Sequence, residues 1–148
     1  MASELYATFT SKKVLIAVGT IVFLIVAGKC GLSYMFTSGE ANSAKERVRR
    51  ILDGMKAGGN REQAIALWKL GTLHIPGGIE AFSMAADEFD AWEVEHELVG
   101  METYEITRAE VMAETGKLGE ATVMVSGTID GRRFKFKVVQ GTPIQWID

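Results

Sequence analysis

The side chains best suited to chemistry gather around His96. Glu95 and Glu97 flank it, and Glu93 lies three residues before it. An imidazole among carboxylates is typical of a metal site or of acid–base catalysis. Here, however, the spacing contains no HExxH pair, the other histidine is the distant His74, and no cysteine lies nearby. The pattern therefore favours a solvated acidic surface, and we predict no metal ligand, no cofactor and no catalytic residue.

Asp90 is the second candidate for acid–base chemistry, because Phe89 and Trp92 stand close to it in the sequence. Apolar surroundings raise the pKa of a carboxyl group and can make it a base inside a cone-shaped pocket. The acidic run around it contains no Lys or Arg; its acids are Asp87, Glu88, Asp90, Glu93, Glu95 and Glu97. Such a run could meet a basic partner, although solubility explains it more simply. An enzyme is accordingly the least favoured of three function classes.

An uncharged stretch, VLIAVGTIVFLIVAG, covers Val14–Gly28, and only Lys29 separates it from the apolar residues that continue to Phe36. Residues 14–36 number 23, and a bilayer core requires about 20. A cleaved secretory signal and a lipoprotein anchor at Cys30 are both alternatives. Lys29 stands where a lipobox needs a small residue, and no good cleavage site follows the run. We therefore favour an uncleaved transmembrane helix in which Lys29 extends towards the headgroups.

The predicted membrane helix has a face of small residues. Ala27 and Gly31 form a small-xxx-small pair, and Thr20 lies further back on the same face. A neighbouring helix can approach such a face closely, so we expect integral membrane proteins as partners. Lys12 and Lys13 adjoin the start of the run, which favours a cytoplasmic N-terminus and a periplasmic domain. Basic residues after the run favour the opposite orientation.

Charge and length divide the chain into four predicted parts: a tail over 1–13, the membrane helix over 14–36, a linker over 37–42 and a soluble domain over 43–148. The chain has 16 Lys and Arg and 19 Asp and Glu. Three of the basic residues and one of the acidic residues lie in the first 36, so the rest of the chain has 13 basic and 18 acidic residues and a net charge of −5. A domain this acidic is poorly suited to nucleic acid. A single cysteine excludes an internal disulfide.

The soluble domain begins with a predicted helix whose polar face is basic. Ser43 and Glu46 form a capping box at its start. An apolar stripe follows at helical spacing, made of Val48, Ile51, Leu52 and Met55. Four basic side chains could hold the domain against anionic lipid at about 1 kcal/mol each; they are Lys45, Arg47, Arg49 and Arg50. A solvated face is the alternative.

Two more helices are expected before the strands. Asn60 can cap a helix over 61–70, which Gly71 ends. The next segment, from Ile79, carries apolar residues at helical spacing: Ile79, Phe82, Ala85, Phe89, Trp92 and His96. Its last part also alternates like a strand, but its length favours a helix at least through Trp92.

The pattern changes to strands after Gly100. Strands are predicted to begin near residues 104, 121, 132 and 144. Asp130-Gly131 predicts a tight hairpin turn, since both residues tolerate positive φ. Alternation over 132–140 places Phe134, Phe136 and Val138 on one face and basic residues on the other, which indicates one buried face. Pro143 marks the last strand as an edge.

Helices followed by an antiparallel meander make an α+β domain. In element order over Ser43–Asp148, the chain resembles the cystatin-like, nuclear-transport-factor-like superfamily, often found behind one N-terminal membrane anchor in bacteria. That resemblance implies a scaffolding domain, a ligand binder or, more rarely, an enzyme, and it carries over no site residue.

Two hypotheses of function are favoured over an enzyme. The favoured one is a non-catalytic accessory or scaffold subunit of a larger membrane complex, such as a respiratory, photosynthetic or secretion assembly. The second is a membrane-tethered module that binds a small apolar ligand between helices and sheet. Its pocket would be lined by Trp92, Phe134, Phe136 and Trp146, although the same residues more simply form the core.

Overall fold

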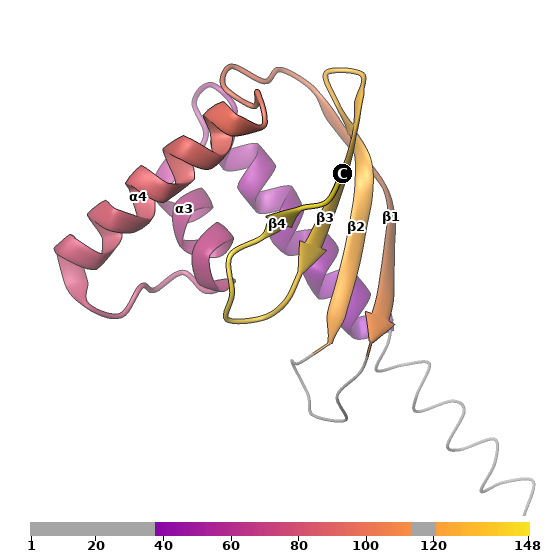
Figure 1. Ribbon diagram of the computed structural model, residues 1–148, viewed down its shortest axis with the longest axis horizontal. Helices are drawn as coiled ribbons and strands as arrows, with labels where there is room; N and C mark the ends of the chain where they lie inside the picture. The colour runs from indigo at the N-terminus through magenta and orange to yellow at the C-terminus, as the bar shows by residue number, and fades with distance from the viewer. Residues whose placement is uncertain (1–37, 114–120) are drawn as a thin grey trace, which may run out of the picture. The chain divides into compact units, whose positions relative to one another are not determined.

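The computed structural model describes residues 38–113 and 121–148, which form an α+β domain (Figure 1). A helix over 38–55 is followed by α3 (Arg61–Leu70) and α4 (Gly78–Glu95). Four strands complete it: β1 (Tyr104–Ala113), β2 (Thr122–Ile129), β3 (Arg132–Val138) and β4 (Gln145–Trp146). Residues 39–148 form one compact unit. The predicted membrane helix over 14–36, with Thr20, Ala27, Lys29 and Gly31, lies outside the described residues.

The strands form one antiparallel sheet in the order β1-β2-β3-β4, and the helices of the described part lie on one side of it (Figure 1). The predicted α+β class and meander are thereby confirmed, with the two-residue β4 at an edge. Among the described residues, no helix has the length and apolar character needed to cross a membrane.

The first helix differs from its prediction. It is already helical at residue 38, so Ser43 lies inside it and the predicted start at a capping box is wrong. A side-chain cap is needed only where backbone N–H groups lack a preceding helical turn. Residues 38–42 supply that turn, so this part of the segment predicted as a linker is helical.

The next two helices agree with their local signals. The Asn60 side chain accepts a hydrogen bond from the Gln63 backbone N–H at 3.0 Å, which caps α3 as predicted. Gly71 ends α3 in the left-handed conformation, with φ of 74°, and its N–H donates to the Leu67 carbonyl. The segment from Gly78 is helical to Glu95, so length, and not the strand-like alternation, decided its structure.

The β2–β3 hairpin turns at Asp130 and Gly131, whose φ values of 47° and 79° confirm the predicted tight turn. The Asp130 carboxylate also accepts hydrogen bonds from the Thr103 backbone N–H at 2.8 Å and from the Glu102 N–H at 3.1 Å. These bonds attach the turn to the segment before β1. They stabilise the ionised form and lower the pKa of Asp130 below its ordinary value of 3.8, the backbone bond from Thr103 contributing most.

Asp130→Asn should keep the turn, because asparagine also adopts positive φ before glycine, but it should lose the charge-assisted bonds. A carboxyl whose pKa is lowered by folding contributes stability above its unfolded pKa and loses it as the pH falls through the folded pKa. We therefore expect wild type to exceed the variant in stability by a constant amount at neutral pH. The difference should shrink below pH 3.8. Urea denaturation at a series of pH values measures this difference in stability. A difference that does not change with pH would contradict the stabilising role of the ionised Asp130 carboxylate.

The sheet bends at a β-bulge in β1. The register with β2 shifts between Ile106 and Arg108, and a Cβ atom on the facing Gly127 would overlap the backbone carbonyl of Glu105. Only glycine permits this close approach of two strands. The bulge sets which β1 side chains face away from the helices.

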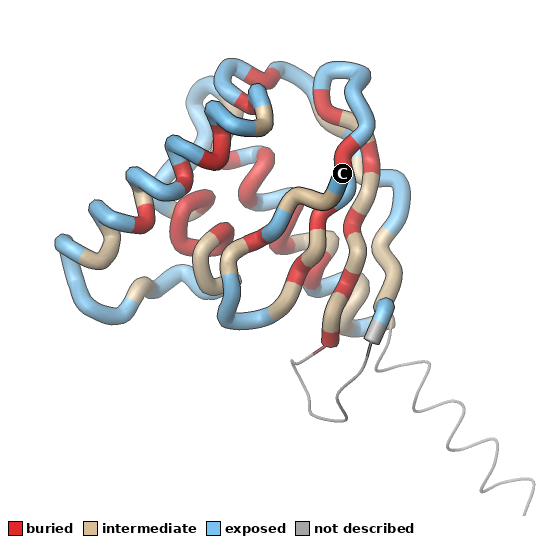
Figure 2. The backbone as a smooth tube through the Cα atoms, in the orientation of Figure 1, coloured by how far each residue is buried: buried red, intermediate tan, exposed pale blue. Residues whose placement is uncertain are grey.

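The core lies between the helices and the inner face of the sheet. Buried and half-buried residues alternate along β2, as the colours of Figure 2 show. The largest fully buried side chains are Phe89, Phe136, Ile51, Leu52, Leu98, Ile129, Val48 and Val125. They come from α4, from the helix over 38–55, from the α4–β1 connection and from two strands, so the core joins both layers.

Candidate functional site

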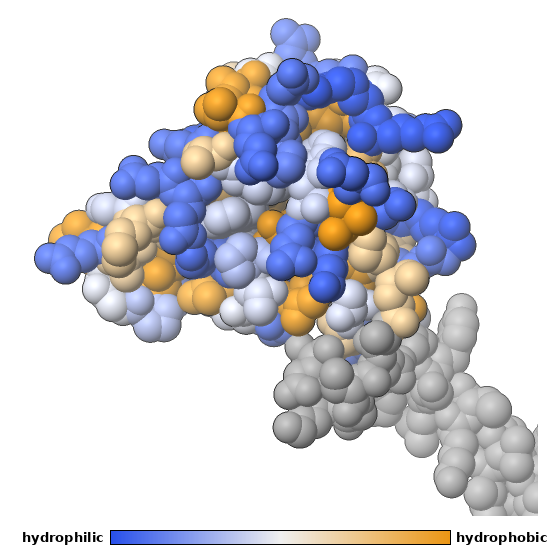
Figure 3. All heavy atoms as spheres, viewed as in Figure 1, coloured by the Kyte–Doolittle hydropathy of each residue, from blue (hydrophilic) through white to orange (hydrophobic). Residues whose placement is uncertain are grey.

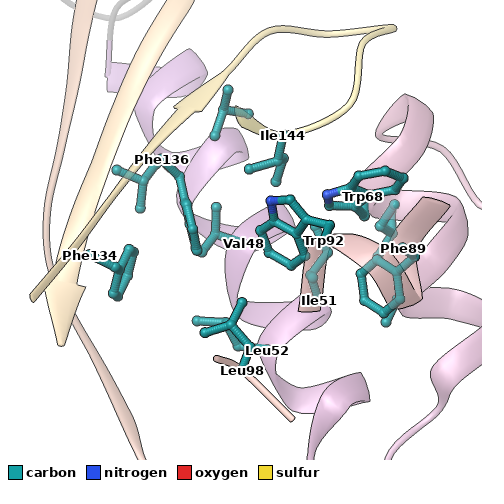
Figure 4. Packing of buried hydrophobic residues seen from close by; sticks show 14 of the residues in the cluster. Val48, Ile51, Leu52, Trp68, Phe89, Trp92, Leu98, Phe134, Phe136 and Ile144 are labelled. Carbon is teal, nitrogen blue, oxygen red and sulfur yellow. The ribbon is translucent and has the colours of Figure 1, made fainter. Parts of the chain in front are cut away.

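The residues proposed to line a ligand pocket are close together, but they pack on one another. Trp92 lies between Phe136 of the sheet and Trp68 and Phe89 of the helices (Figure 4), with ring centroids 5.7–5.8 Å away. The ring centroid of Phe136 also lies 4.5 Å from that of Phe134 and 5.3 Å from that of Trp146. These are ordinary separations for packed aromatic rings. A ligand between helices and sheet would therefore have to displace these rings.

Two polar atoms are enclosed in this aromatic cluster. The indole N–H groups of Trp68 and Trp92 are buried and have no hydrogen-bond partner in the part of the chain that the structure describes. A buried donor without a partner is uncommon and costs about 1–3 kcal/mol. The two tryptophans therefore contribute through packing and not through hydrogen bonding.

His96 contributes a flat ring to the same cluster. Its imidazole stacks on Trp146 with centroids 4.7 Å apart and planes 9° apart, and it meets Trp92 edge-on at 5.7 Å. A stacked imidazole shields a face of Trp146 from solvent. Over the described ranges 38–113 and 121–148, no three His, Cys, Asp or Glu side chains are placed to hold a metal ion.

Basic side chains from other elements pair with the acidic run over 87–97. Lys69 of α3 binds Glu88, and Arg132 of β3 binds Glu97 at 2.5 Å. Because these partners are distant in the sequence, the run appears unpaired when read alone. Four of its six acids are paired in the structure; they are Glu88, Asp90, Glu93 and Glu97.

Arg61 pairs with two of these acids at once. It binds Asp90 at 2.5 Å and both carboxylate oxygens of Glu93, and its guanidinium lies 5.3 Å from the Phe89 ring centroid. The hydrogen bond to Glu93 is the main reason why the pKa of Arg61 is raised. The solvated position predicted for Glu93 is wrong, because the residue is 5% exposed. Asp90 keeps the solvated position that the sequence favoured: its side chain is 59% exposed and paired with Arg61, so it lacks the apolar surroundings that the acid–base alternative needs.

Arg47 is buried, and it joins three separate segments. Its guanidinium donates to the Leu67 carbonyl at 2.6 Å and the Trp68 carbonyl at 2.9 Å, in the last turn of α3. It also donates to the carbonyls of Val139 at 2.9 Å and Thr142 at 2.8 Å, after β3. Burial lowers its pKa to about 10, so it remains protonated at neutral pH.

The predicted lipid contact changes accordingly. Arg47 cannot reach a headgroup, because it is buried and bound to carbonyls, so its place in that prediction is wrong. Arg49 and Arg50 are exposed and both pair with Glu46. Lys45 makes no ion pair with any described residue. Lipid binding through Lys45, Arg49 and Arg50 stays a prediction.

An apolar groove lies between α3 and the first turns of α4. It has a volume of about 700 Å³ and is lined by Asn60, Glu62, Gln63, Ala66, Leu73, His74, Ile75, Gly78, Ile79 and Phe82. Ile79 is 87% exposed and Leu73 61% exposed, so large apolar side chains face solvent here. Figure 3 shows hydrophobic residues at this end of the molecule, among hydrophilic ones.

Sequence reasoning missed this groove. Helical spacing assigned Ile79 to the core-facing side with Phe82 and Phe89, but the first turns of α4 extend away from the sheet (Figure 1). Periodicity shows which side of a helix is apolar but not how far the covering layer extends. The available signal was the density of apolar residues, Leu73, Ile75 and Ile79, around a Pro-Gly-Gly turn.

Comparison with protein-family models, curated proteins and solved structures found no match for this chain.

Proposed function

We propose that this protein is a non-catalytic accessory subunit that docks on a larger membrane protein complex. The observation that carries the proposal is the exposed apolar groove between α3 and α4, where Ile79 and Leu73 face solvent. Exposed apolar surface rimmed by polar residues is typical of protein–protein contact sites. The apolar run over 14–36 supports a membrane location, as a predicted single-pass helix with the domain in the periplasm.

The lining of the groove suggests the chemistry of the partner. Ala66, Leu73 and Ile79 supply apolar contacts, whereas Glu62 is the acidic residue at the same groove. Glu80 in the first turn of α4 adds negative charge nearby. A partner segment with apolar side chains and a flanking Lys or Arg would match both features.

Ile79→Asp tests the groove. A charge at a central apolar contact is expected to weaken docking by about 2 kcal/mol or more, roughly 30-fold. Folding stability should change by less than about 0.5 kcal/mol, because Ile79 is exposed and its loss leaves no cavity. The measurement is the size of the assembly that the full-length chain forms after mild detergent extraction of its native membranes, together with the proteins that co-purify.

Val99→Asp is the matched control, because Val99 is 68% exposed and does not line the groove. It should co-purify with the same partners as wild type. Equal recovery of partners by both variants would reject the groove as the docking site. A wild-type chain that always migrates as a free monomer would reject the accessory-subunit function itself.

A further inference from the structure

The outer face of the sheet carries a row of cations on β3. Arg133, Lys135 and Lys137 alternate with the buried Phe134 and Phe136, so all three face away from the helices. None of them forms an ion pair with a residue in the described part of the chain. This contrasts with the acidic run over 87–97, where four of the six acids are paired. In Figure 3 hydrophilic residues project from the sheet side of the molecule.

A groove of about 600 Å³ runs beside two of these cations. Its lining residues are Thr107, Ser126, Gly127, Thr128, Arg133, Phe134, Lys135, Trp146, Ile147 and Asp148. Thr128 pairs with Arg133 and Ser126 with Lys135 across the strands, so a hydroxyl stands next to each cation. Ile147, whose N–H donates to the Lys135 carbonyl at 2.9 Å, adds an apolar wall. Asp148 is the acidic residue of the lining.

We infer that this face binds an acidic polypeptide segment in extended conformation. Residues two apart on a strand place their side chains about 7 Å apart on one face. An extended peptide with an acid at every second position has the same repeat, so its carboxylates match Arg133, Lys135 and Lys137 one to one. The neighbouring hydroxyls can donate to the same carboxylates.

Other anionic partners fit this face less well. Single-stranded nucleic acid binds through stacking on aromatic rings. The two aromatic residues in the lining, Phe134 and Trp146, already pack on Phe136 and on His96. A lipid surface is flat and meets protruding residues, whereas Lys135 lies along a groove that Ile147 borders. The cations of β3 lie on a different surface from the apolar groove of α3 and α4, so peptide binding does not depend on the proposed docking function.

The test uses the full-length chain and a fluorescent synthetic peptide of alternating glutamate and threonine, with binding followed by anisotropy at low salt. Lys135→Glu should weaken binding about fivefold, the effect of losing one exposed attraction and adding a repulsion. Lys45→Glu is the matched control: it makes the same change of charge on the helix over 38–55, and it should bind like wild type. Asp148→Asn should bind more tightly.

A second peptide tests the spacing of the acids. A peptide of the same composition with its glutamates in one block should bind more weakly, because an extended chain turns only every second side chain towards the sheet. Equal binding of both peptides, or equal weakening by Lys135→Glu and Lys45→Glu, would overturn the inference. So would a Lys135-dependent preference for oligothymidylate, or for phosphatidylserine vesicles, over the peptide. Ile79→Asp should leave peptide binding unchanged, so failure of the docking proposal and failure of this one are separable.

Discussion

Replacing Arg47 with methionine is expected to lower the free energy of unfolding by about 3–5 kcal/mol. Methionine retains most of the side-chain length, but it leaves carbonyls of two separate segments without their donor. Those segments, the last turn of α3 and the chain after β3, are both bound by this one guanidinium. Urea denaturation of the full-length chain, followed by tryptophan fluorescence, measures the change.

Arg50→Met is the matched control for Arg47. Arg50 lies on the same helix but is exposed, and its partner Glu46 lies one turn away, so its loss should cost less than about 1 kcal/mol. Arg47→Lys should recover only part of the loss, because an ammonium lacks the planar fork of donors. If the methionine variant fails to fold, the lysine variant still reports the effect. Equal destabilisation by Arg47→Met and Arg50→Met would contradict the structural role of Arg47.

Phe136→Ala is also expected to lower the free energy of unfolding by about 3–5 kcal/mol. Phe136 is 1% exposed and contacts the rings of Trp92, Phe134 and Trp146, so truncation leaves a cavity at the centre of the aromatic cluster. Phe136→Leu keeps more of the volume and should cost less than about 1.5 kcal/mol. Thermal unfolding of both variants and wild type provides the comparison.

The same variants separate a packed core from a ligand pocket. An apolar cavity made by truncation can bind a small aromatic compound such as indole. We expect indole to raise the unfolding temperature of Phe136→Ala and to leave wild type unchanged, because the wild-type rings already contact one another. Stabilisation of wild type by indole would favour the membrane-tethered ligand-binding alternative.

The elements that the sequence predicted well are those whose determinants lie within a few residues. Asn60 and Gly71 mark the ends of α3, because a cap bonds to the adjacent turn. Asp130 and Gly131 mark the hairpin, because positive φ is a property of those two residues. Alternation along β3 identified its buried face, since strand geometry alone sets that period. The α+β class followed from the order of these elements.

The features that sequence reasoning missed depend on contacts between distant segments. No local sequence pattern indicates that Arg47 is buried. The carbonyls that it binds lie 20 to 95 residues away, and a surface arginine at helical spacing has the same sequence pattern. Glu93 is buried because Arg61, 32 residues earlier, is near it. Ile79 is exposed because the sheet does not extend beneath the start of α4.

The sequence by itself thus determined the elements, their order and the inner face of the sheet, because backbone geometry and capping act over one or two turns. Only the tertiary structure decided which charges are paired and which apolar residues remain uncovered. Pairing depends on where a second segment lies in space, and exposure depends on where the covering layer ends. Both candidate surfaces, the apolar groove at Ile79 and the cations around Lys135, are defined by what the rest of the described domain leaves unpaired or uncovered.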